Sequence, residues 1–285
     1  MLWMKRNAYE ESTIRKVAKL LRHLKKNCNT KAPEEVKLYI ANKTCGNGHK
    51  ENLVEAYAIY IRSEGLTWEQ PFYQRYDKKR RAPKEKLVDF LINNARIEMK
   101  LKLSILKDLG LRPIELTWLR IQDIDLSTGI VSITGAKHTV GREGKLTPKT
   151  RELLKIYIAT KKLNSTSRIY NGKSSNLSAN YRHYRNRIAE EYNMPELKQI
   201  QLYDFRHFYA TMLYHKTKDL LHVKAKLGHR DLRTTLRYTQ LLETLENDEY
   251  HCKTAINIKQ ATQLIENGFE YITEKDGTML FRKRK

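Results

Sequence analysis

Long apolar runs are missing from this sequence, and cysteine is rare. No run of 18 or more apolar residues occurs, and residues 1–6 are not followed by an apolar segment, so we expect neither a membrane span nor a secretory signal. The three cysteines, Cys28, Cys45 and Cys252, have spacings unlike a metal-ligand pattern, and we interpret them as buried or incidental thiols. These absences predict a cytoplasmic protein with no membrane partner, no bound metal and no disulfide framework.

Acidic side chains are also scarce. The 285 residues hold 32 Asp and Glu against 55 Lys and Arg, a formal net charge of +23. A lysine-rich thermophile surface would bring matching glutamate, which this chain does not have. The excess therefore favours a nucleic-acid partner, whose phosphates such a surface neutralises. Residues 1–50 hold 12 Lys and Arg against 4 Asp and Glu, and we expect them to face that partner.

The apolar spacing predicts a mainly α fold with a small β-sheet, in two domains. Residues 1–76 have the pattern of a small helical domain, with one helix opened by Pro33. Residues 77–83 are polar and basic and end in a proline, which is typical of a linker. A nuclear-localisation patch is the other interpretation of this basic run. Residues 84–285 would form a larger mixed domain, with an appendage from about residue 246.

Two strand pairs are expected in the larger domain. Residues 129–134 have the composition of a strand, and residues 141–146 would return as its partner, with Lys137 near the turn. Residues 269–281 predict a hairpin with an Asp-Gly turn, after a helix ended by Gly268. Between these pairs, Ser178 is expected to cap a helix.

Four residues form a set suited to cutting a phosphodiester: Arg112, Arg206, His229 and Tyr238. A phosphodiester repels nucleophiles, and its charge must be spread over the equatorial oxygens in the transition state, which planar and always-charged guanidinium groups stabilise. A tyrosine can then serve as the nucleophile. Each residue also has a structural interpretation: Arg112 could pair with Glu115, His229 could follow a helix end, and Tyr238 is one of 17 tyrosines.

The order of these residues carries a resemblance. The chain is similar to the tyrosine recombinase (phage integrase) family over about residues 82–245, because five separated elements occur in the order of that family's motifs. These elements are Gly110-Leu111-Arg112-Pro113-Ile114-Glu115-Leu116, Lys137, Tyr203-Asp204-Phe205-Arg206-His207, Leu227-Gly228-His229 and Thr234-Thr235-Leu236-Arg237-Tyr238-Thr239. The first domain resembles the family's helical core-binding domain only in placement, size and charge.

The resemblance implies a role for each residue. Arg112 and Arg206 would clamp the scissile phosphate, and His229 would hydrogen-bond a non-bridging oxygen. Tyr238 would attack phosphorus, leaving a 3′-phosphotyrosyl bond and a free 5′-hydroxyl. Lys137 would protonate that leaving oxygen, although Lys145 competes for this role. Because the covalent bond conserves the energy of the phosphodiester, neither a cofactor nor a metal is required.

One residue departs from the family pattern. Tyr203 stands three places before Arg206, where the family usually has histidine, a substitution that resembles archaeal plasmid and viral integrases. A phenol is normally a hydrogen-bond donor at pH 7 and not a base. Tyr203 would therefore position the phosphate, and whether it also accepts the proton of the nucleophile stays open.

The resemblance implies a site-specific recombinase or integrase, which would integrate or excise a mobile element. Two domains would close as a clamp around double-stranded DNA, in a tetramer of this chain. One alternative is a type IB topoisomerase, which the small first domain and the integrase-like motifs disfavour. Another is a non-catalytic DNA-binding regulator, which would have no need of a nucleophile. The segment after Tyr238 would pack on its own domain or dock on a neighbouring subunit, and both alternatives stay open.

Overall fold

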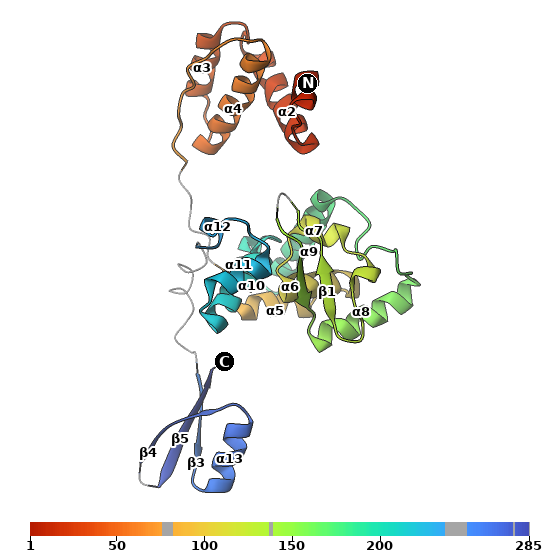
Figure 1. The fold of residues 1–285 in the computed structure, drawn as a ribbon, viewed down its shortest axis with the longest axis vertical. Helices are drawn as coiled ribbons and strands as arrows, with labels where there is room; N and C mark the ends of the chain where they lie inside the picture. The colour runs from red at the N-terminus through yellow and green to blue at the C-terminus, as the bar shows by residue number, and fades with distance from the viewer. Residues whose placement is uncertain (76–81, 137–138, 237–249, 276, 285) are drawn as a thin grey trace. The chain divides into compact units, whose positions relative to one another are not determined.

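The computed structural model describes residues 1–75, 82–136, 139–236, 250–275 and 277–284 (Figure 1). The chain divides into two compact units, Met1–Arg80 and Arg81–Lys285. Helices dominate both units, and the described strands form two small antiparallel sheets. The predicted mainly α fold with a small β component is therefore confirmed. No helix in these described ranges is long and apolar enough to cross a membrane.

The first unit is a group of helices around an apolar core. Its helices are α1 (Leu2–Arg6), α2 (Glu11–Asn27), α3 (Pro33–Asn42) and α4 (Asn47–Ser63). Helices α2 and α4 pack against each other, and the core consists of Leu24, Val36, Ile40, Leu53, Val54, Tyr57 and Ile61. On the outer face of α2, exposed cations lie at helical spacing and form one basic stripe: Lys19, Arg22 and Lys26.

The second unit is built around helix α6. Its helices are α5 (Glu85–Asn93), α6 (Ile97–Leu109), α7 (Pro113–Trp118), η1 (Ile121–Asp123), α8 (Pro148–Lys161), α9 (Ser174–Glu191), η2 (Pro195–Gln199), α10 (Asp204–Thr217), α11 (Leu220–Leu227) and α12 (Arg233–Leu236). Helix α6 contacts α5, α7, α8 and α10, and its leucines are almost fully buried. Figure 1 shows α6 between α10 and a β-hairpin. The expected helix start at Ser178 is wrong, because α9 begins at Ser174 and the Ser178 hydroxyl donates to the Ser174 carbonyl within the helix.

The β-hairpin confirms the first predicted strand pair. Strand β1 (Ile130–Ile133) pairs antiparallel with β2 (Arg142–Lys145). Burial alternates along β2, so that Arg142 and Gly144 face inward while Lys145 is exposed. A Cβ atom on Gly144 would lie 2.6 Å from the Leu109 side chain, which shows how closely β2 approaches α6. The hairpin thus directs the Arg142 side chain into the unit.

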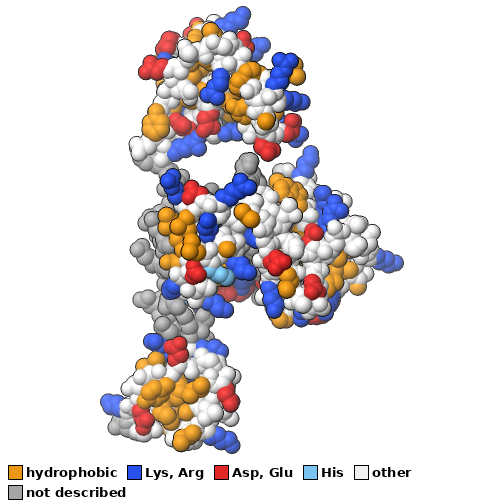
Figure 2. Space-filling view, viewed as in Figure 1, with side chains coloured by type: hydrophobic (Ala, Val, Ile, Leu, Met, Phe, Trp, Pro, Cys, Tyr) orange, Lys and Arg blue, Asp and Glu red, His pale blue; other side chains and the backbone are white. Residues whose placement is uncertain are grey.

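The C-terminal part is a small sheet with one helix. It consists of β3 (Tyr250–Ala255), α13 (Ile258–Glu266), β4 (Glu270–Lys275) and β5 (Thr278–Arg284). The predicted pairing of β4 with β5 is confirmed, whereas β3 was not predicted and also pairs with β5, so that β5 is central. Phe281 packs with alanines of β3 and α13. Apolar side chains gather on the visible face of this part in Figure 2, and Ile256 and Ile258 are exposed.

Candidate active site

Arg112 is held between two helices by backbone geometry. Helix α6 ends at Gly110, whose φ of +57° is left-handed, and a Cβ atom there would lie 2.3 Å from the Tyr209 ring. The chain then turns sharply into α7, for which Arg112 is the N-cap. The Arg112 N–H donates to Glu115 Oε2 and its Nη1 donates to Glu115 Oε1, both at 2.9 Å. Glu115 therefore fixes both the backbone and the guanidinium of Arg112.

Arg206 is fully buried, with 0% of its side chain exposed. It lies in the first turn of α10, where Nη1 donates to the Gly110 carbonyl at 2.8 Å and Nη2 donates to the Leu227 carbonyl at 2.7 Å. Its Nη1 lies 3.7 Å from Glu115 Oε2. Among the described residues, no acceptor is within hydrogen-bonding distance of its buried Nε–H. Buried donors without a partner are rare in proteins, and within the described ranges the Nε–H of Arg142 is another one in this site.

Glu115 is shared by three arginines. Besides Arg112 and Arg206, it accepts hydrogen bonds from Arg142, whose Nη2 lies 2.8 Å from Oε2 and whose Nη1 lies 3.4 Å from Oε1. Burial would raise the pKa of Glu115, but the hydrogen bonds and charges of the arginines outweigh it and lower that pKa. We call Glu115, Arg112, Arg142 and Arg206 the arginine cluster. Three guanidinium cations and one carboxylate leave it with a formal charge of +2.

Burial and the neighbouring positive charges both act on the guanidinium of Arg206. Burial, together with the positive charges of Arg112 and Arg142, lowers the pKa of Arg206 to about 10, while Glu115 opposes this shift. The guanidinium still keeps its proton at neutral pH. Holding more cations than anions in a buried place is unfavourable unless an anion completes the site. The cluster is therefore suited to binding an anionic group.

His229 lies beside Arg206, directly after the glycine that ends α11. Gly228 has a φ of +66°, and a Cβ atom there would lie 2.6 Å from the Val140 carbonyl oxygen. His229 Nε2 lies 3.1 Å from Arg206 Nη2, and Nδ1 lies 2.9 Å from Thr235 Oγ1. Because a guanidinium only donates, Nε2 accepts and the imidazole proton is on Nδ1, where it points to Thr235. The structure thus brings three predicted site residues together: Arg112, Arg206 and His229.

Of the remaining predicted residues, Tyr203 interacts electrostatically with Arg206, and the others lie on the exposed face of β2 or outside the described ranges. Tyr203 is the N-cap of α10, and its ring centroid lies 5.2 Å from that of His207. Lys137 and Tyr238 lie outside the described residues. The residue before Lys137 is tied to the cluster, since the Ala136 N–H donates to Glu115 Oε1 at 3.4 Å. Lys145, the competing lysine, is on the exposed face of β2.

Thr139 and Val140 attach the other side of the β1–β2 loop to the site. The Thr139 hydroxyl donates to the Ala136 carbonyl at 2.6 Å and accepts from Arg112 Nη1 at 3.4 Å. The Val140 N–H donates to the Gly228 carbonyl at 3.2 Å. Both flanks of Lys137 are therefore held beside residues of the arginine cluster and of the His229 segment.

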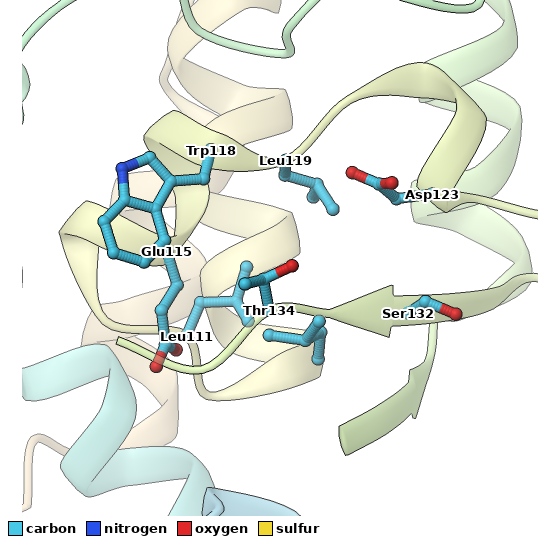
Figure 3. Close-up of a pocket in the computed structure, with 8 residues that line it drawn as sticks. Leu111, Glu115, Trp118, Leu119, Asp123, Ser132 and Thr134 are labelled. Carbon is cyan, nitrogen blue, oxygen red and sulfur yellow. The ribbon is translucent and has the colours of Figure 1, made fainter. Parts of the chain in front are cut away.

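A small cavity borders Glu115 and is also lined by Trp118 of α7, Asp123 of η1 and Ser132 of β1 (Figure 3). Its volume of about 10 Å³ has room for about one water molecule. In Figure 3 the Glu115 carboxylate points away from Asp123, whose carboxylate points toward Leu119. At this volume the cavity is too small to bind a substrate. Within the described ranges, no group of three His, Cys, Asp or Glu side chains is arranged to hold a metal ion.

The arrangement can bind a phosphate and stabilise added negative charge on it. Two guanidinium groups held by one carboxylate, with an imidazole beside them, form a preorganised set of donors around an anion. Sequence reasoning did not identify Arg142 as part of the arginine cluster. Arg142 lies outside the five sequence elements that carry the resemblance, and only its place on the inward face of a correctly registered strand distinguishes it from its neighbours.

Comparison with known proteins agrees with these features. Residues 82–244 match the model of the phage integrase family, which is more than half of the chain, and the chain therefore belongs to that family. The tyrosine recombinase XerA of Saccharolobus solfataricus is 29% identical over 154 residues, which cover 54% of this chain and 50% of that protein. The tyrosine recombinase XerA of Pyrococcus furiosus is 26% identical over 228 residues, covering 75% and 74%.

Solved structures show the same fold. The Tn1549 transposon integrase, in complex with transposon right end DNA, superimposes with a TM-score of 0.64 at 14% identity, covering 82% of this chain and 91% of that chain. At this identity the likeness concerns the fold alone. The chain spans about half the length of the first curated relatives it matches.

Proposed function

We propose that this protein is a site-specific DNA recombinase that cuts and rejoins DNA through a covalent tyrosine intermediate. The observation that carries the proposal is the arginine cluster, in which Glu115 holds two motif arginines beside His229. Such a cluster is positively charged, buried and incomplete without an anion. The relatives are named as tyrosine recombinases and a transposon integrase, which supports the same proposal.

The arginines would stabilise the transition state. The unsatisfied Nε–H of Arg206 offers a donor to a non-bridging phosphate oxygen, and Arg112, whose side chain is 14% exposed, is the more accessible guanidinium. As the nucleophile approaches, the phosphate acquires more negative charge. The +2 charge of the cluster therefore attracts the phosphate more strongly in the transition state than in the ground state. The cluster therefore favours the transition state over bound, uncut DNA.

The proposed chemistry is an in-line exchange of one ester for another. The phenolic oxygen of Tyr238 gives up its proton to a base, attacks phosphorus and forms the phosphotyrosyl bond, while the bond from phosphorus to the 5′-oxygen breaks. Lys137 donates a proton to that leaving oxygen. We prefer Lys137 to Lys145 because Lys145 is on the exposed face of β2, whereas the neighbour of Lys137 bonds to Glu115. Attack by another 5′-hydroxyl reverses these steps and joins the strands.

His229 has to change its hydrogen bonding during this reaction. In the described arrangement its Nε2 accepts from Arg206 and cannot donate to a phosphate oxygen. Donation requires a proton on Nε2, either by protonation of the ring or by a shift of tautomer in which the Thr235 hydroxyl turns and donates to Nδ1. Binding of the phosphate would draw the Arg206 guanidinium toward it and release Nε2 for this role.

Tyr203 would hold the phosphate through its hydroxyl. It begins α10 one turn before His207, in the same short segment that positions Arg206. Whether Tyr203 also accepts the proton of Tyr238 is a question that pH–rate measurements on variants answer, as described in the Discussion.

The first unit would supply much of the DNA affinity as a core-binding domain. The basic stripe of α2 is exposed and carries three cations on one face, a pattern suited to phosphate contacts along a duplex. The second unit would be the catalytic domain, with residues 77–83 as a basic linker between the two. Recombination joins two DNA sites, so we propose that four copies of this chain act together on them.

The test is cleavage of a suicide DNA substrate, in which a nick traps the covalent complex, followed by denaturing electrophoresis. The parent protein should form a protein–DNA adduct, and Tyr238→Phe should abolish the adduct while DNA affinity stays nearly unchanged. An adduct that survives in Tyr238→Phe contradicts the assignment of the nucleophile. DNA binding without any adduct from the parent protein would instead support a non-catalytic DNA-binding regulator, and relaxation of supercoils without strand exchange would support a topoisomerase.

A further inference from the structure

Arg142 is an almost fully buried arginine that binds Glu115 with both ends of its guanidinium. Its side chain is 4% exposed, and its Nη2 and Nη1 reach the two carboxylate oxygens at 2.8 and 3.4 Å. A fork of this kind fixes the plane and the rotation of a carboxylate, which a single hydrogen bond does not. Glu115 in turn holds Arg112 at 2.9 Å and faces Arg206 at 3.7 Å. Arg142 is thus placed to orient the other two arginines through one shared group.

Charge neutralisation alone does not explain Arg142. Arg112 already forms an ion pair with Glu115, and Arg206 lies beside it, so the carboxylate has enough positive charge without a third arginine. Adding Arg142 raises the formal charge of the cluster from +1 to +2 in a buried place, which is unfavourable for folding by itself. The extra cation is explained if the site binds an anion that gains charge during a reaction.

Arg142 also touches the segment that carries His229. A Cβ atom on Gly228 would lie 3.4 Å from Arg142 Cδ and 3.5 Å from its Nη1, so the arginine lies against the backbone of Gly228. Through its hairpin, Arg142 is likewise continuous with the β1–β2 loop, which is anchored to Gly228 by Val140. One side chain therefore contacts the carboxylate that holds the arginines and the turn that positions the histidine.

We propose that Arg142 is a positioning residue for the cleavage reaction: it fixes Glu115, and thereby Arg112 and Arg206, in the orientation that receives the scissile phosphate. In this role Arg142 acts through Glu115 and not by contact with the phosphate. The proposal rests on the proposed function, because it concerns the rate of the same strand cleavage.

The experiment measures the single-turnover rate of adduct formation, and separately the dissociation constant for uncut DNA, at a temperature where unfolding curves show every variant folded. Arg142→Gln should slow adduct formation about 10–100-fold, the range found when a group that orients an active-site residue is removed. The dissociation constant should change less than about twofold, since the ground-state phosphate is bound by many other contacts. Arg142→Lys keeps the charge but not the fork and should remain well below the parent rate.

Two comparisons separate positioning from a general loss of stability. Arg185→Gln removes another arginine of the second unit that is only 9% exposed and that donates to the Ile200 carbonyl, and it should leave the rate unchanged. In Glu115→Gln, the further change Arg142→Gln should slow the reaction little, because a residue that acts through Glu115 has nothing left to orient. The comparison of Glu115→Gln with the double variant also tests the proposal if Arg142→Gln alone does not fold.

A parent-like rate in both Arg142→Gln and Arg142→Lys would overturn the proposal. So would independent, multiplying losses from Glu115→Gln and Arg142→Gln, or an equal slowing by Arg185→Gln. If the parent protein itself forms no adduct, the proposed function fails and the role of Arg142 fails with it.

Discussion

Replacing Glu115 with glutamine should lower the stability of the second unit. Glu115→Gln removes one negative charge, with 0% of the side chain exposed, from among three guanidinium groups, of which the nearest donors lie 2.8 and 2.9 Å away. The amide NH2 of glutamine would also face donors and accept nothing. Removing one partner of a buried ion pair costs about 3–5 kcal/mol. For a unit of this size, about 2–4 °C of melting temperature is lost per kcal/mol, so the second unit should melt on the order of 6–20 °C lower.

The pH dependence gives this prediction its sign. The pKa of Glu115 is lowered in the folded protein, so its carboxylate stabilises the fold in full above the unfolded pKa of about 4.3, and this contribution is lost as the pH falls through the lowered value. The difference between the parent and Glu115→Gln should therefore be constant from neutral pH to about pH 4.5 and shrink in more acidic solution.

Scanning calorimetry of the full chain at several pH values measures both effects. Glu152→Gln is the matched control, because Glu152 is an exposed glutamate of the same unit that pairs with Lys155, and this variant should melt like the parent. Glu115 is not the ionised centre of the cluster if Glu115→Gln and the control have the same melting temperature at neutral pH. The same conclusion follows if the difference in melting temperature between Glu115→Gln and the parent is equally large in acid.

Variants at four further places test the proposed roles of Tyr203, the basic stripe of α2, Gly228 and Thr235. Tyr203→Phe should slow single-turnover cleavage on the order of a hundredfold, as expected for the loss of one transition-state hydrogen bond. Tyr203→His should keep substantial activity, with the pH optimum of cleavage moved toward about pH 6.5. Equal rates for the parent and Tyr203→Phe at every pH would show that the hydroxyl has no role. Changing the three cations of the basic stripe of α2 to glutamine should weaken DNA binding. The slope of log affinity against log salt concentration should become shallower by up to about 0.9 for each phosphate contact that is lost. An unchanged slope would show that the stripe faces solvent. Gly228→Ala should destabilise the second unit by about 1–3 kcal/mol in urea unfolding, because its φ of +66° is left-handed and its Cβ would meet a carbonyl. Thr235→Val removes the hydroxyl that bonds to His229 and should slow cleavage about 10–100-fold. Thr235→Ser keeps the hydroxyl and should cleave at a rate near that of the parent. Single-turnover rates of the two variants test this prediction.

Much of the fold could be predicted from local patterns. The β1–β2 pair and the β4–β5 hairpin follow from strand composition and turn residues, which act over neighbouring residues. Strand β3 was missed because the register that joins it to β5 depends on contacts between distant residues. The start of α9 was misplaced because Lys173 forms the N-cap without a side-chain hydrogen bond, so no capping residue marked it.

The candidate site, like the fold, could be predicted only in part from the sequence. Arg112, Arg206 and His229 were predicted because they belong to sequence motifs, and the structure brings them together. The pairing of Arg112 with Glu115 could also be predicted, because Glu115 is three positions after Arg112 at a helix start. The roles expected for Lys137 and Tyr238 stay predictions, because both residues lie outside the described ranges. Arg142 reaches Glu115 across 27 residues of sequence, and no local signal records such a contact. Side chains that act through tertiary contacts are therefore the part of a site that a single sequence leaves hidden.

The two carbonyls that hold Arg206 belong to Gly110 and Leu227, which lie 96 and 21 residues away in the sequence. This guanidinium is consequently in place only when α6, α10 and α11 have come together. A nascent or partly unfolded chain could still adhere to DNA through the basic stripe of its first unit, but it would have no assembled phosphate site. Under the proposed function, a chain in which these three helices have not assembled could bind DNA but could not break a strand.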